Sequence, residues 1–151
     1  MEYPDGIHTF VNRTRDNLEV IRAIKRGESP NRKVWEFTQL INSMLGLLVF
    51  PQQEYLESIP KIPLDKLRED GWRIPKVADG FCDPEDLQQL FRKLRNSVAH
   101  FNIEFIVEDQ QLSGLTIWNT DPNTGVTNWL AEISKEDLED LTNRFVNLLL
   151  D

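Results

Sequence analysis

The stretch that decides the fold is Asp83-Pro84-Glu85-Asp86 followed by LQQLFRKLRNSVAHF, residues 87–101. Its first four residues place a capping carboxylate, a first-turn proline and two further acids at a helix start, where the helix dipole favours negative charge. Apolar residues then recur at spacings of three and four, namely Leu87, Leu90, Phe91, Leu94, Val98 and Phe101. This pattern predicts a long helix over about 84–100 with one continuous apolar stripe.

Three other segments have the same helical spacing of apolar residues. They span about 7–26, 32–50 and 135–150, and the second is apolar on most sides, which predicts a central position in the fold. Ser134 and Asp137 resemble a capping box that opens the last helix. The chain between 51 and 83 is rich in Pro and Gly, so we expect a crossover with one short helix near 64–70, packed by Trp72 and Phe81.

The apolar period changes between the third long helix and the last one. Residues 101–105 alternate between apolar and polar, 115–118 form a partner strand, and turn residues at 121–125 precede a third strand candidate at 127–133. We therefore expect a small antiparallel β-hairpin or sheet inserted over about 101–133. The sequence predicts one mainly α domain over 1–151, a helical bundle carrying this insert.

Charge and composition restrict the partners of the chain. The net charge is -8 and the sequence pI about 4.8, which disfavours a broad basic surface for long duplexes. Residues 104–151 hold ten acids and two bases, whereas the N-terminal third carries a small positive excess. A single cysteine, Cys82, excludes an internal disulfide, and the N-terminus has no export-signal pattern. We expect a cytoplasmic protein with no membrane segment.

Three polar residues of the third long helix fall on one line. On a helical wheel, Arg92, Asn96 and His100 lie opposite the apolar stripe, and Arg95 lies on the flank, roughly 140° from His100. One ideal helix does not point Arg95 and His100 at one atom unless the Arg side chain curls, the helix distorts or a second protomer completes the site. An ordinary surface role for His100 near a helix C-terminus, where the dipole favours a cation, stays open.

The run Arg95-Asn96-Ser97-Val98-Ala99-His100 resembles the signature of the HEPN superfamily, the higher eukaryotes and prokaryotes nucleotide-binding domains. In that family an Arg, often followed by Asn, precedes a His by four to six residues, late in a long helix of an antiparallel bundle. Many members are metal-independent endoribonucleases that act as dimers. The resemblance thus implies a HEPN-like antiparallel helical bundle, a homodimer and an RNA substrate, with no cofactor and no metal.

The resemblance also implies a role for each residue of the motif. His100 would be the general base or acid toward a ribose 2′-hydroxyl, Arg95 would hold the scissile phosphate, and Asn96 would orient either of them. Arg92 and Lys93 would add local positive charge for substrate binding. Toxin or defence functions, with an antitoxin or a regulatory protein as partner, are also implied. Asn102 stands where toxins silenced by a nucleotidyltransferase commonly carry a modified Tyr.

Two rival functions remain open on the sequence alone. One is a module of the same fold that binds a nucleotide or RNA without cutting it. The other is a structural or protein-interaction dimer in which the polar line joins two helices.

Other chemistry-bearing residues have simpler explanations. The acids at 136–140 fit a solvated helix start, His8 has no second metal ligand nearby, and Cys82 has no basic surroundings. Trp118 and Trp129 fit hairpin packing better than base stacking.

Overall fold

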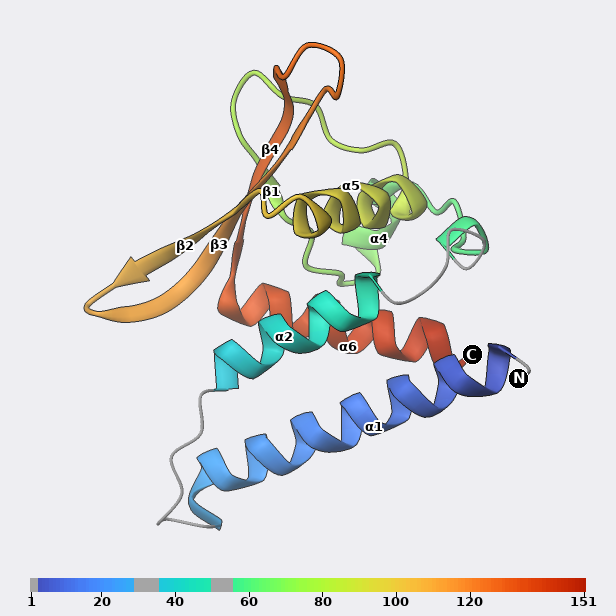
Figure 1. Ribbon diagram of the computed structural model, residues 1–151, viewed down its shortest axis with the longest axis vertical. Coiled ribbons are helices and arrows are strands. Elements are labelled where there is room, and N and C mark those ends of the chain that lie inside the picture. Colours follow the sequence, from blue (N-terminus) through green and yellow to red (C-terminus); the bar gives the residue numbers. More distant parts are fainter. Residues whose placement is uncertain (1–2, 29–35, 50–55) are drawn as a thin grey trace.

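The structure is a computed structural model that describes residues 3–28, 36–49 and 56–151 (Figure 1). Helices α1 (Tyr3–Ala23), α2 (Glu36–Val49) and α6 (Lys135–Leu150) contact one another on one side of the molecule. Helix α1 continues into a π-helical turn, η1 (Ile24–Glu28), in which Gly27 has a φ of 93°. The predicted start of the second helix at 32–35 and its end at 50 lie outside the described residues.

Helix α5 (Leu87–Ala99) joins this helical layer to a β-sheet. The rings of Phe91 on α5 and Phe145 on α6 stack with their centroids 4.1 Å apart, and both side chains are fully buried. Contacts between α5 and both α2 and strand β3 (Gln111–Thr120) place α5 at the centre of the core. The apolar stripe predicted from the sequence is therefore confirmed from Leu87 to Leu94.

The sheet has four antiparallel strands in the order β1-β4-β3-β2. Strand β1 is Lys76–Val77, β2 is Ile103–Glu108 and β4 is Thr127–Ser134. In this order of strands, β2 lies at one edge of the sheet. Ile117 of β3 pairs with Ile103 of β2 and with Ala131 of β4. Trp129 of β4 is completely buried, which confirms the packing role predicted for it.

The four-stranded sheet contradicts the prediction of a mainly α fold, because the described part of the chain is mixed α/β. The sequence prediction misses two features of the sheet. The crossover contributes a fourth strand, β1, which pairs with β4 far along the sequence, and β3 runs for ten residues. The sheet is not a peripheral insert, since its buried face carries Leu115, Ile117 and Ile133 into the common core.

The short helix of the crossover and the start of α5 agree only partly with the sequence prediction. The short helix is present as α4 (Leu64–Glu69), but α5 begins three residues later than expected. Its N-cap is Asp86, whose side chain accepts a hydrogen bond from the Gln89 N–H at 2.9 Å. Asp83 instead forms an ion pair with Arg68 at 2.9 Å, so it belongs to the crossover and not to the helix. Among the described helices, none is both long and apolar enough to cross a bilayer.

Candidate active site

The last turn of α5 and its C-cap carry the exposed polar residues of the predicted motif. The side chains of Asn96 and His100 are exposed, and the His100 N–H donates to the Asn96 carbonyl at 3.1 Å. His100 is the C-cap, with φ -99° and ψ 7°, and the helix is regular through Ala99. Arg95 is partly buried and lies five residues before His100, which corresponds to about 140° around the helix.

A buried polar network fixes this turn against the sheet. Ser97, inside the motif, is fully buried, and its hydroxyl accepts a hydrogen bond from the Asn119 side-chain amide at 2.7 Å. The same hydroxyl lies 2.8 Å from the Trp118 carbonyl and 2.9 Å from the Lys93 carbonyl, and can donate its proton to one at a time. The Asn119 amide also donates to the Lys93 carbonyl at 2.8 Å. These contacts hold Asn96 and His100 on a rigid base.

Ser97 and Asn119 were missed as site residues in the sequence. The signal for Ser97 was its place three residues after Leu94, which is the spacing of the buried stripe. A serine at such a position must find hydrogen-bond partners, because a buried unsatisfied hydroxyl is costly. Asn119 carries no comparable local signal, since its partner lies on another element.

The prediction that Phe101 continues the apolar stripe is wrong, because 86 % of its surface is exposed. The Phe101 N–H donates to the Val98 carbonyl at 3.2 Å, and the Asn102 N–H donates to the Ser97 carbonyl at 2.8 Å. This pairing is the Schellman motif, in which the residue after the C-cap is left-handed and usually glycine. Phe101 takes that conformation with φ 57°, which turns the chain out of α5 toward β2.

The charge around the motif is positive in an otherwise acidic chain. Between residues 87 and 103 there are three basic residues, Arg92, Lys93 and Arg95, and no acidic one. The Lys93 amino group is 5.8 Å from the centroid of the Trp129 ring, and Lys93 lines a cavity with residues 80–85. Burial lowers the pKa of Lys93. Arg92 is partly buried on α5.

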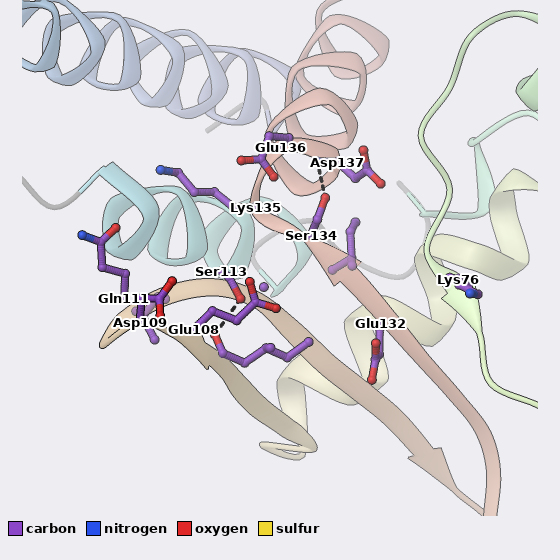
Figure 2. Close-up of a pocket in the computed structure, with 14 residues that line it drawn as sticks. Lys76, Glu108, Asp109, Gln111, Ser113, Glu132, Ser134, Lys135, Glu136 and Asp137 are labelled. Atoms are coloured by element: carbon purple, nitrogen blue, oxygen red, sulfur yellow. Dashed lines mark hydrogen bonds between the residues drawn. The ribbon is translucent and has the colours of Figure 1, made fainter.

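A groove of about 650 Å³ lies away from the motif, between the β2–β3 turn and the start of α6 (Figure 2). Two lysines and five acids are among its lining residues: Lys76, Lys135, Glu108, Asp109, Glu132, Glu136 and Asp137. This excess of carboxylates disfavours the binding of phosphates, so the groove is a poor place for RNA. Within 3–28, 36–49 and 56–151, no group of three or more His, Cys, Asp or Glu could hold a metal ion.

A family model described as HEPN pEK499 p136 matches residues 1–151. The match covers the whole chain, so the protein belongs to this HEPN family, as the motif on α5 indicated. Comparison with curated proteins and with solved structures found no match to the chain. Family membership supports a HEPN-type module.

Proposed function

We propose that this protein is an endoribonuclease that cuts RNA without a metal ion at a site built from Arg95, Asn96 and His100 of two copies. The proposal rests chiefly on one observation. Asn96 and His100 are exposed together at the end of the acid-free helix α5 in a HEPN chain, on a turn that Ser97 and Asn119 hold in place.

The proposed chemistry needs one imidazole and one guanidinium. His100 removes the proton from a ribose 2′-hydroxyl, because an imidazole exchanges protons near neutral pH. The 2′-oxygen then bonds to the neighbouring phosphorus, and the bond from phosphorus to the 5′-oxygen breaks. Arg95 stabilises the negative charge that develops on the phosphate oxygens. The products are a 2′,3′-cyclic phosphate and a 5′-hydroxyl that takes up a proton.

A second copy would remove the geometric conflict between Arg95 and His100. Because α5 is regular through Ala99, the two residues leave their own helix in different directions. In a homodimer, Arg95 of one copy can approach His100 of the other. Phe105 and Val107 are more than half exposed on the edge strand β2, which follows the motif, and exposed apolar residues of this kind suit a contact between copies.

The test is cleavage of single-stranded RNA in excess chelator by the wild type, His100→Ala and His8→Ala. His8, the other histidine of the chain, lies partly buried on α1 and is the matched control. We expect wild-type and His8→Ala protein to give 2′,3′-cyclic ends and His100→Ala to be slower by about 100-fold or more. Equal rates for His100→Ala and wild type would contradict the assignment. RNA binding with no product would favour the non-cutting module instead.

A further inference from the structure

Phe101 combines three properties that packing does not explain. Phe101 is the most exposed large hydrophobic residue in the described part of the chain, at 86 %. Its backbone is left-handed, which costs a non-glycine residue conformational free energy. It follows His100 directly in the sequence. Glycine would form the same turn without the strain, so the aromatic ring stabilises nothing in the described fold.

The backbone on both sides of Phe101 is fixed. On one side the Schellman hydrogen bonds end α5. On the other, the Trp118 N–H donates to the Asn102 carbonyl at 3.2 Å, and Ile103 pairs with Ile117. The ring therefore projects from a rigid turn, and little backbone entropy is lost when a ligand contacts it.

The exposed residues close to Phe101 in the chain are polar. Asn96, His100 and Glu104 are exposed, and the helix that leads to the ring carries three basic residues and no acid. Proteins bind single-stranded nucleic acids by combining an exposed aromatic ring with cationic side chains, because bases stack on the ring while cations hold the backbone.

We propose that Phe101 is the stacking platform for a nucleobase next to the phosphodiester that is cleaved with His100 as the base. This inference rests on the proposed function and adds a specificity determinant to it. Phe101 then anchors the RNA through the face of a base, without reading its edge, so single-stranded RNA is favoured over a duplex whose bases are already stacked.

The test compares Phe101→Gly, Phe101→Leu and Phe101→Trp with the wild type. Leu keeps the strain and the apolar surface but has no aromatic face, Trp keeps the face, and Gly removes both the strain and the ring. The probe is a fluorescent 2′-O-methyl oligoribonucleotide, which lacks the attacking hydroxyl, and a matched abasic oligomer of equal length. We expect the Gly and Leu variants to bind the first probe about 10-fold or more weakly, with Trp near wild type. All four proteins should bind the abasic oligomer alike.

The outcomes separate this inference from the proposed function. The stacking role alone would be overturned if the wild-type protein binds and cleaves RNA and Phe101→Gly binds the 2′-O-methyl probe with the same affinity as the wild type. Loss of the wild-type dimer in Phe101→Gly, measured by sedimentation, would show that the ring packs on a second copy, which also overturns it. A wild-type protein that neither binds nor cuts RNA would overturn the proposed function, and the stacking role with it.

Discussion

The side-chain amide of Asn119 on β3 lies 2.7 Å from the hydroxyl of Ser97 on α5, and both side chains are buried. This contact joins the central strand of the sheet to the helix turn that carries Asn96 and His100. It lies behind the candidate site, and neither residue is part of the polar line on α5.

Ser97→Ala should lower the free energy of unfolding by about 1–3 kcal/mol, because it removes the hydroxyl that accepts from the buried Asn119 amide. Ser113→Ala is the matched control on β3, since the Ser113 hydroxyl makes one longer hydrogen bond at 3.3 Å and is only partly buried. Urea denaturation of the two variants measures the difference. In a double-mutant cycle, Ser97→Ala and Asn119→Ala should be non-additive. Wild-type stability for Ser97→Ala would contradict the network.

Asp86→Ala should destabilise the protein by about 1 kcal/mol, the usual cost of losing an N-cap side chain. For a chain of this size that corresponds to a fall of about 2–4 °C in Tm, measurable by calorimetry. Asp83→Ala is the comparison. Its exposed ion pair with Arg68 should be worth less, in the range of about 0–1 kcal/mol. A larger loss for Asp83→Ala than for Asp86→Ala would mean that α5 begins earlier than Leu87.

Lys93 should make stability depend on alkaline pH. Burial lowers the pKa of Lys93 from its ordinary value of 10.5, so the unfolded chain holds this proton at pH values where the folded chain has begun to lose it. The cost of burying the charge is fully present below the folded pKa and is relieved as pH rises toward 10.5. The wild type should therefore gain stability relative to Lys93→Met over that window, measured by urea denaturation at several pH values. A constant difference between the two proteins across the window would contradict this.

Helices α5 and α6, strand β4 and part of strand β3 could be predicted from the sequence, because their signals are local. Apolar spacing and caps involve residues that are neighbours in sequence, as in the hydrogen bond from the Asp137 N–H to the Ser134 side chain. Strand β1 could not be predicted in this way. It has two residues, and its existence depends on pairing with Ala131 and Glu132, which lie far along the chain. Without β1 and the full length of β3, the sheet looked like a minor insert.

In the candidate site, too, local features could be predicted from the sequence and contacts between distant parts of the chain could not. The spacing of Arg95 and His100 and the polar line can be taken from the sequence, because a helical wheel describes them as long as the helix continues. The wheel fails at Phe101, where the helix has already ended and the left-handed position holds Phe in place of the usual Gly or Asn. The buried contact between Ser97 and Asn119 depends on how α5 packs against the sheet, which no local pattern contains.

Two inactive variants should restore activity when they are combined, if each site takes Arg95 from one copy and His100 from the other. In a dimer of one Arg95→Ala chain and one His100→Ala chain, one site has lost both groups and the other retains both. Random mixing of equal amounts makes half of the dimers mixed, so about a quarter of wild-type activity should return. The subunits are exchanged by unfolding the two variants together and refolding them, and RNA cleavage is compared with each variant treated alone. If Arg95 and His100 acted from the same chain, every site in the mixed dimer would lack one group and the mixture would remain inactive.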